Sequence, residues 1–202
     1  MKTWGKVLLG ALGTAVIYEG IIQLNEIAER ENYWQLARKY CDKIGKPLLR
    51  IGIRRSSFEP PNGDVTLDVD LKVLDIPGGV HGDERDMPFS DKEFGCCFNE
   101  HTLEHLHTCE DVEMAVNECA RVADFTVLLC PSPYSIYSNL FNPTHYLRLW
   151  FDNDKNRVIV RPNHWRTGLG FVYEGDTGGM GKSTGQAMVV YEPINLPAVI
   201  PG

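Results

Sequence analysis

The fold of this chain is decided by the stretch Gly82-Asp83-Glu84-Arg85-Asp86-Met87-Pro88-Phe89-Ser90-Asp91-Lys92-Glu93-Phe94. It leads into a short apolar run at residues 94–98 and then into Glu100-His101-Thr102-Leu103-Glu104-His105. Apolar residues at helical spacing over 111–122 separate this run from a second apolar run at 125–130. A strand, a helix and a strand in this order are typical of parallel strands joined by a crossover helix.

Apolar runs with β-branched residues predict two earlier strands, at 48–53 and 65–69. With the two strands above they indicate a mostly parallel α/β sheet. Three later runs, at 158–161, 170–173 and 187–191, follow one another without helical segments between them. They predict an antiparallel hairpin that closes the edge of the sheet.

Composition limits the classes of function. With 202 residues, of which 43% are hydrophobic, the chain is long enough for one globular core. A net charge of −7 supplies no cluster of Lys and Arg for phosphate contacts, which predicts that nucleic acid is not a partner. The six cysteines lie mostly in apolar segments and form no CxxC pair, so we expect buried thiols and no disulfide framework.

The N-terminus carries an almost continuous apolar run at residues 7–24, near the lower limit of the roughly 17 to 25 residues that span a bilayer. We predict a membrane anchor over 1–24. The alternative is a helix docked on its own domain or on a partner, because Glu19 would be costly in lipid. An amphipathic linker helix follows at 25–45. The Lys and Arg residues beyond the run place the main domain on the cytoplasmic side of the membrane.

The opening stretch resembles the middle of class I S-adenosylmethionine-dependent methyltransferases of the compact type 11-like kind. In that family a "GD…LPF.D..FD" segment precedes "LEH" and then "E..RV", and here Glu118-Cys119-Ala120-Arg121-Val122 supplies the last of these. The resemblance covers about residues 46–150, within a methyltransferase-like domain at 46–192 and before a Pro-rich tail at 193–202. It implies a Rossmann-like sheet with helices on both faces and a reversed C-terminal strand, with S-adenosylmethionine bound above the first strand ends.

The resemblance also implies the residues of the donor site. Gly52 would begin the glycine-rich loop, and Asp68 or Asp70 would hold the ribose hydroxyls. Asp83 would lie near the adenine amino group with Glu84 and Met87 beside the base, whereas Glu100 and His101 would face the methionine end and the acceptor. The loop departs from the family, because Arg50-Ile51-Gly52-Ile53-Arg54-Arg55 keeps one glycine and places arginines where backbone approaches the ligand.

Residues 143–148 resemble the "P…H…Y.R" stretch of the compact subgroup, where His145, Tyr146 and Arg148 would border the acceptor pocket. His145 could act as a general base, because an imidazole titrates near neutral pH. The alternative is a capping loop in which His145 satisfies backbone groups.

Two other motifs match patterns of different families. His101-Thr102-Leu103-Glu104-His105 fits the H-x-x-E-H zinc pattern, but the methyltransferase register accounts for the same letters, and we predict no metal site. The segment at 177–184 resembles a phosphate loop, but too little chain follows it for a nucleotide-hydrolysing core. We interpret it as a hairpin tip.

The sequence therefore favours a membrane-associated methyltransferase acting on a small-molecule, lipid or sugar acceptor. The alternative is a catalytically inactive structural subunit that kept the fold and joins protein partners in a larger membrane complex. A zinc hydrolase is the third hypothesis, and it rests on the H-x-x-E-H motif alone.

Overall fold

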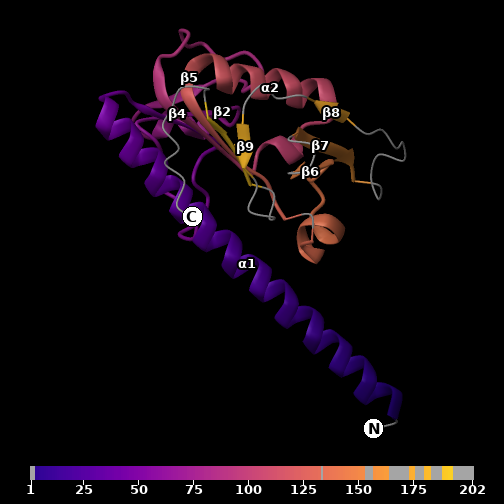
Figure 1. Cartoon of the computed structure of the whole chain (residues 1–202). Coiled ribbons are helices and arrows are strands. Elements are labelled where there is room, and N and C mark those ends of the chain that lie inside the picture. The colour runs from indigo at the N-terminus through magenta and orange to yellow at the C-terminus, as the bar shows by residue number, and fades with distance from the viewer. Residues whose placement is uncertain are drawn as a thin grey trace.

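A computed structural model describes residues 3–132, 134–152, 157–163, 173–175, 180–182 and 188–192 (Figure 1). Seven strands form the main sheet, in the order β3-β2-β1-β4-β5-β10-β9. Their bounds are β1 Leu48–Ile51, β2 Val65–Asp68, β3 Gly79–His81, β4 Phe94–Glu100, β5 Ala123–Leu129, β9 Met180–Lys182 and β10 Met188–Glu192.

The strand order confirms the predicted fold class. The first five strands of the sheet pair in parallel, and β10 then pairs antiparallel with β5 and with β9. The order reverses between β1 and β4, which are neighbours in the sheet although β2 and β3 lie between them in sequence. An open α/β sheet places its ligand site at the carboxyl ends of the strands at such a point.

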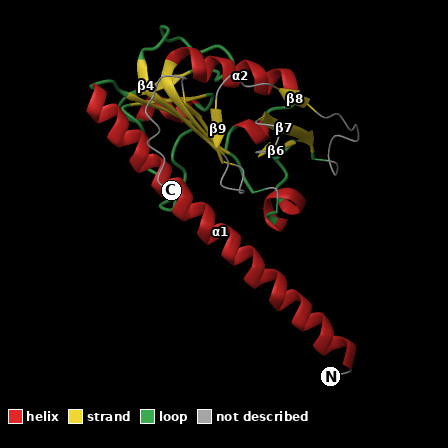
Figure 2. Cartoon of the chain, viewed as in Figure 1, coloured by secondary structure: helices red, strands yellow, loops and turns green. Residues whose placement is uncertain are grey.

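One long helix covers each face of the sheet (Figure 2). Helix α1, Thr3–Ile44, packs its C-terminal half on one face, where Trp34, Ala37 and Cys41 are buried. Trp34 meets Phe98 of β4 edge to face, with 5.1 Å between the ring centroids. This packing is the tertiary contact that holds α1 on the sheet.

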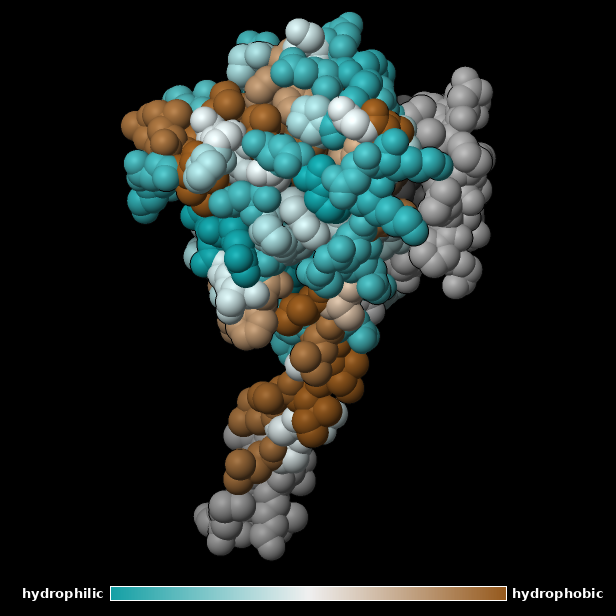
Figure 3. Space-filling view, turned by 90° about the vertical axis from the view of Figure 1, so that its left-hand side faces the viewer, coloured by the Kyte–Doolittle hydropathy of each residue, from teal (hydrophilic) through white to brown (hydrophobic). Residues whose placement is uncertain are grey.

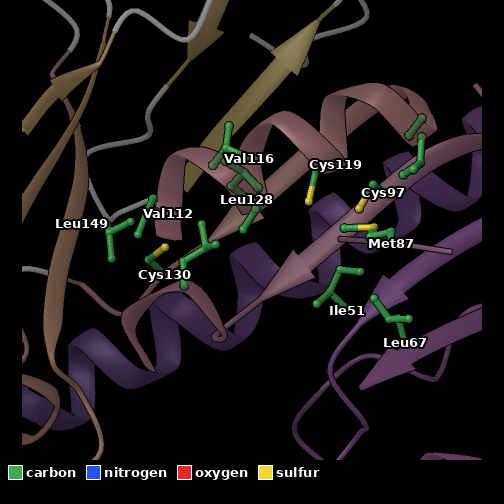
Figure 4. Close-up of a cluster of buried hydrophobic side chains, with 14 of the residues drawn as sticks. Ile51, Leu67, Met87, Cys97, Val112, Val116, Cys119, Leu128, Cys130 and Leu149 are labelled. Atoms are coloured by element: carbon green, nitrogen blue, oxygen red, sulfur yellow. The ribbon is translucent and has the colours of Figure 1, made fainter. Parts of the chain in front are cut away.

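Helix α2, Cys109–Val122, covers the opposite face. It begins at Thr108, whose hydroxyl accepts a hydrogen bond from the backbone N–H of Asp111 at 3.0 Å. Its buried face consists of Cys, Ala and Val side chains, which pack on Leu, Ile and other apolar side chains of the sheet (Figure 4). All six cysteines are buried and unpaired, as the sequence predicts. Their small size allows the two helices to lie close to the strands.

A second, three-stranded antiparallel sheet lies beside the main one and consists of β6 Leu147–Asp152, β7 Arg157–Pro162 and β8 Tyr173–Gly175. The sequence predicts the strands of β7 and β10 correctly but assigns them to one hairpin. The structure instead places β7 in the second sheet, while β10 and β9 close the main one. Strand β6 falls in the segment that the sequence assigns to the acceptor pocket.

The single-turn elements are η1 Leu71–Asp75, η2 Leu103–His105 and the π-helical turn η3 Tyr137–Phe141. Residues 52–64 join β1 to β2 as a loop, without the helix that usually covers such a connection. The segments at 176–179 and 183–187 and the tail at 193–202 lie outside the described residues. Predictions about a hairpin tip and a Pro-rich tail therefore stay predictions.

The predicted anchor and linker helices form one continuous helix, whose N-terminal half projects from the domain (Figure 3). Within the described part of the chain, no helix has a stretch long and apolar enough to cross a bilayer. The prediction of a transmembrane helix is therefore not supported. Glu19, the residue that weakened that prediction, is bound to the domain: its carboxylate accepts from the Ser135 hydroxyl at 2.6 Å and from the Ile136 N–H at 2.8 Å.

We expect Trp34→Ala to lower the free energy of unfolding by about 3–5 kcal/mol, because it removes a buried aromatic ring and leaves a cavity between α1 and β4. Leu24→Ala is the matched control on the same helix, since Leu24 is 68% exposed and its loss should change stability by less than about 0.5 kcal/mol. Urea unfolding followed by circular dichroism measures both. Equal effects of the two substitutions would contradict the packing described for α1.

Candidate functional site

A pocket of about 770 Å³ opens at the carboxyl ends of β1, β2 and β4. Gly52 follows β1, Asp68 ends β2 and Glu100 ends β4, and all three line the pocket. Ligand pockets in proteins typically have volumes of roughly 300–1,000 Å³. The pocket therefore has the size for a nucleoside-sized ligand and lies where the strand order reverses.

Gly52 begins the loop after β1 with a φ of +88°, a conformation that side chains with a Cβ rarely adopt. A Cβ at this position would also lie 3.2 Å from Cγ2 of Thr102. The next residue, Ile53, donates its backbone N–H to Oδ2 of Asp68 at 2.8 Å. The turn that family members build with several glycines is thus built here with one glycine and an aspartate.

Asp68 and Asp70 are the two alternatives for a carboxylate that holds the ribose, and only Asp68 lines the pocket. Asp68 is buried, lines the pocket and accepts the N–H groups of Ile53 and Asp70, both at 2.8 Å. Asp70 is the N-cap of η1, where it accepts the N–H of Lys72 at 3.1 Å, and it does not line the pocket. Asp68 is therefore the candidate.

Asp83 and Glu84 line the pocket after β3. The Arg85 guanidinium binds both oxygens of Asp83, at 2.9 and 2.6 Å, and holds the pKa of that carboxyl below its usual value. Glu84 is buried and accepts from Nδ2 of Asn99 at 2.6 Å and from the Thr102 hydroxyl at 2.8 Å. Burial raises the pKa of Glu84 to about 7 in spite of these two donors.

Met87 was predicted to lie beside the adenine, and the structure contradicts this. Its side chain is 4% exposed and belongs to the core beneath α2, close to Cys97 (Figure 4). It does not line the pocket. The segment turns inward after Arg85, because the carboxylate of Glu118 on α2 accepts the Met87 N–H at 2.8 Å.

The arginines of the loop do not fill the pocket. Arg54 is exposed and donates to the carbonyl groups of Ser56 and Ser57, within its own loop. The side chain of Arg55 is 70% exposed at the rim, 3.9 Å from Oδ2 of Asp68. Arg50 is buried within β1 and is held by Glu59 and Glu100, each at 3.1 Å.

Glu100, predicted to face the methionine end, lines the pocket but its carboxylate is committed to ion pairs. Besides Arg50 it pairs with Arg30 of α1, with Nη1 and Oε1 3.3 Å apart. Burial raises the pKa of Glu100, although both guanidinium groups oppose the rise. Arg30 brings α1 into the wall of the pocket.

Histidines gather at the other end of the pocket around Glu104, which is 1% exposed. Nδ1 of His101 and Nε2 of His145 lie 3.6 and 3.7 Å from Oε1 of Glu104. The ring of His105 meets that of His145, with the centroids 5.0 Å apart. His101 and His145, the two histidines predicted for the acceptor end, thus lie beside the same carboxylate oxygen of Glu104.

His101 has a φ of +53°, which is uncommon for a residue with a side chain and is found at functional sites. Burial and the Arg30 guanidinium lower its pKa well below the usual range. A histidine with a low pKa is a weak base at neutral pH. This favours a positioning role for His101 over proton abstraction.

Of the residues predicted for the donor site, Gly52, Asp68, Asp83, Glu84 and Glu100 line the pocket, whereas Asp70 and Met87 do not. The roles of the first five toward a donor stay predictions. Neither Arg30 nor Arg50 was predicted for the site, although both line the pocket. Arg50 stands in the middle of an apolar strand, and a buried cation of this kind needs carboxylate partners. That signal was present in the sequence. Arg30 carried no comparable signal, because the direction of α1 determines where its side chain lies.

Residues 65–124 match the family model described as a methyltransferase domain. The match spans β2 to the start of β5 and includes Asp68, Asp83, Glu84, Glu100 and His101. It confirms for this segment the resemblance that the sequence motifs indicate. A search of curated proteins gave no match.

Solved structures of similar proteins include the PH0226 protein of Pyrococcus horikoshii, with 15% identity and a TM-score of 0.45, covering 82% of this chain and 90% of that one. A SAM-dependent methyltransferase of Archaeoglobus fulgidus has 24% identity and a TM-score of 0.41, and covers 57% of this chain and 61% of its own. A possible histamine N-methyltransferase of Thermotoga maritima has 14% identity and a TM-score of 0.38, with 81% and 93% covered.

We expect the buried Glu84 to make stability depend on pH. Its pKa is higher in the folded chain, about 7, than the usual 4.5, so the protonated group favours folding below about pH 4.5 and this contribution is lost as the pH rises through 7. The shift corresponds to about 3 kcal/mol. Glu84→Gln keeps an oxygen that accepts from Asn99 and Thr102, and it removes the charge.

Urea unfolding of both proteins between about pH 5 and pH 8 provides the measurement. As the pH rises, the unaltered chain should lose unfolding free energy relative to Glu84→Gln, because only the unaltered chain has to bury a charge at this position. Other buried carboxylates titrate equally in both proteins, so the difference isolates Glu84. A gap that does not change with pH would show that Glu84 is charged throughout this range.

Proposed function

We propose that this chain binds S-adenosylmethionine in the pocket above β1, β2 and β4 and transfers its methyl group to an acceptor held at the histidine end. The observation that carries the proposal is Asp68, a carboxylate at the end of β2 that faces the pocket beside the single tight glycine turn of Gly52. The family match of residues 65–124 supports the same assignment.

The donor would lie with its ribose at Asp68 and its base toward Asp83 and Glu84. A carboxylate oxygen accepts more than one hydrogen bond, so Asp68 can hold its two backbone N–H groups and still receive a ribose diol. Glu84, with its pKa near 7, can accept from an amino group or donate to a ring nitrogen. Each wall of the pocket therefore offers a group suited to a nucleoside.

The acceptor would enter at the end formed by His101, Glu104 and His145. Methyl transfer depends first on holding a nucleophile in line with the sulfonium, and rigid groups at the end of the pocket serve that purpose. His145 is fixed by the Ser138 carbonyl, which lies 3.0 Å from its Nδ1. Its second nitrogen, Nε2, points toward Glu104.

We further propose that the projecting part of α1 associates with the surface of an anionic membrane. Its apolar side chains are exposed, among them Leu12 at 57%, Val16 at 71% and Ile17 at 66%. The Tyr18 hydroxyl donates to the Tyr134 carbonyl at 3.2 Å, which joins this surface to the exposed aromatic residues Tyr137 and Phe141 of η3. No acidic residue precedes Glu19, whereas Lys2 and Lys6 do, so the charge suits anionic headgroups.

This surface reaches the rim of the pocket. The exposed turn η3 runs directly into Asn142, which lines the pocket, and His145 follows three residues later. An acceptor with an apolar part would pass from the membrane surface to the histidine end along this turn. The arrangement favours a lipid-like acceptor over a sugar.

We expect Asp68→Asn to weaken binding of S-adenosylmethionine and S-adenosylhomocysteine at least about tenfold, because hydrogen bonds to a charged acceptor contribute roughly 1.5–3 kcal/mol. Asp70→Asn is the matched control, since it makes the same change two residues away on a cap that does not face the pocket. Isothermal titration calorimetry on the full chain measures all three proteins.

Absence of any heat and of any thermal shift for the unaltered chain would overturn the proposal. It would favour the inactive structural subunit and turn the search toward protein partners. Equal weakening by Asp68→Asn and Asp70→Asn would show that the ribose is held elsewhere.

We expect Ile17→Glu to reduce binding to vesicles that contain anionic phospholipid at least about tenfold, because it places a charge in the apolar surface. Met114→Glu is the control, since Met114 is 50% exposed on α2, across the sheet from α1. Vesicle flotation measures both. Unchanged flotation of Ile17→Glu would refute the association, and a loss of self-association in its place would identify a second copy of the chain as the partner of this surface.

A further inference from the structure

Three side chains at the histidine end of the pocket bring potential metal ligands together. They are Glu104 and His105 from η2 and His145 from the loop before β6, and one ligand atom of each lies within 4.8 Å of the others. The backbone also joins the two segments, because the Tyr146 N–H donates to the Glu104 carbonyl at 2.8 Å. The cluster is therefore held by two parts of the chain that are about forty residues apart in sequence.

Both histidines are held in the tautomer that a metal ion needs. Nδ1 of His105 lies 2.8 Å from the Thr144 carbonyl, and Nδ1 of His145 lies 3.0 Å from the Ser138 carbonyl. A carbonyl only accepts, so each Nδ1 carries the proton and each Nε2 presents a lone pair. A backbone carbonyl behind the ring is the usual outer partner of a metal-binding histidine.

The Glu104 carboxylate is buried without the donors that such a group requires. It is 1% exposed, and neither oxygen has a hydrogen-bond partner among the described residues. The carboxyl groups of Glu84, Glu26 and Glu100 are its neighbours and add negative charge around it. A buried, unpartnered carboxylate is costly, and a bound cation would remove the cost.

We propose that Glu104, His105 and His145 form a site for one divalent transition-metal ion. Two ligands of a tetrahedral zinc ion lie about 3.4 Å apart when their bonds have ordinary lengths. Nε2 of His145 and Oε1 of Glu104 are 3.7 Å apart, so a small inward movement of either side chain is sufficient. Two imidazoles and a carboxylate are also the donor set of many zinc sites that keep one position open.

A bound ion would replace the hydrogen bond between Asn142 and His145. Nε2 of His145 accepts from Nδ2 of Asn142 at 2.8 Å, and the orientation of this amide is fixed because its oxygen accepts from the Thr144 N–H and hydroxyl. Asn142 lines the pocket, so its amide can donate to water or ligand when the ion takes the imidazole. His101, with Nδ1 3.6 Å from Oε1 of Glu104, would lie beside the ion without being one of its three ligands.

The open position would face the pocket, which all three ligands line. This step rests on the proposed function: the ion would hold an oxygen of the methyl acceptor next to the donor. A Lewis acid binds hydroxyl and carboxylate oxygens and lowers the pKa of a bound hydroxyl. The site therefore favours an oxygen-bearing acceptor over a protonated amine, which has no lone pair to offer.

The test uses the full chain, stripped with a chelator and titrated with Zn²⁺ by calorimetry and with Co²⁺ by visible absorption. We expect one ion per chain and the intense absorption of a low-coordinate Co²⁺ site. Glu104→Gln and His105→Asn should each weaken the affinity at least about 100-fold. His81→Asn is the control, because His81 is an exposed histidine bound to the Val69 carbonyl on β3.

Folding and donor binding are measured on the same variants. Glu104→Gln removes a buried charge, so it should unfold at the temperature of the unaltered chain or above it. Titration of S-adenosylhomocysteine should give the same affinity for all variants within about threefold, which separates this inference from the proposed function. No binding of either ion to the unaltered chain, or equal binding by Glu104→Gln and His81→Asn, would overturn the metal site while leaving donor binding in place.

Discussion

The structure around the pocket depends on one buried guanidinium, that of Arg50 in the middle of β1. A cation that is 1% exposed is stable only with charged and hydrogen-bonding partners around it. Glu100 comes from the end of β4, Glu59 from the loop after β1, and the Pro61 carbonyl, 2.9 Å from Nη1, from the same loop. Arg30 then joins Glu100 and ties in α1. One charge thus fixes a loop, a strand end and a helix.

This network also holds the loop after β1, whose first residues keep one glycine where the resemblance to methyltransferases implies a glycine-rich loop. In a glycine-rich loop the backbone turns tightly and approaches the ligand without side chains. Here the turn is made once, at Gly52, and Arg50 anchors the later part of the loop through Glu59 and the Pro61 carbonyl. Ile53, Arg55 and Glu59 of this loop line the pocket. The Arg54 side chain turns back on the same loop and donates to the Ser56 and Ser57 carbonyls. The loop thus turns on one glycine, Gly52, and an ion pair between Arg50 and Glu59 holds its later part.

The limits of sequence reasoning follow from which interactions are local. Strand and helix positions around the parallel sheet follow from apolar periodicity, and the carboxylates at strand ends follow from the family register. Glu19 argues against a membrane anchor over residues 1–24, but the sequence does not show what this carboxylate binds. Its partners, the Ser135 hydroxyl and the Ile136 N–H, lie more than a hundred residues away. The predicted position of Met87 beside the pocket is wrong for a similar reason. Its backbone N–H donates to Glu118 on α2, which turns the segment toward the core. Contacts between distant segments decide both cases, and no local pattern encodes them.

Buried carboxyl groups gather in and beside the pocket, and three of them, Glu84, Glu100 and Glu104, line it. A fourth, Glu26, is buried near Glu104 but does not line the pocket, and burial raises the pKa of all four groups because the charged form is costly there. Three of them have donors: Ser132 for Glu26, Asn99 and Thr102 for Glu84, and the arginines for Glu100. Carboxylates in a region of low dielectric attract cations strongly. A sulfonium or a divalent ion would supply such a cation and favour the charged form of these groups, and Glu104, whose carboxylate accepts no hydrogen bond from the described residues, is the one that most needs it.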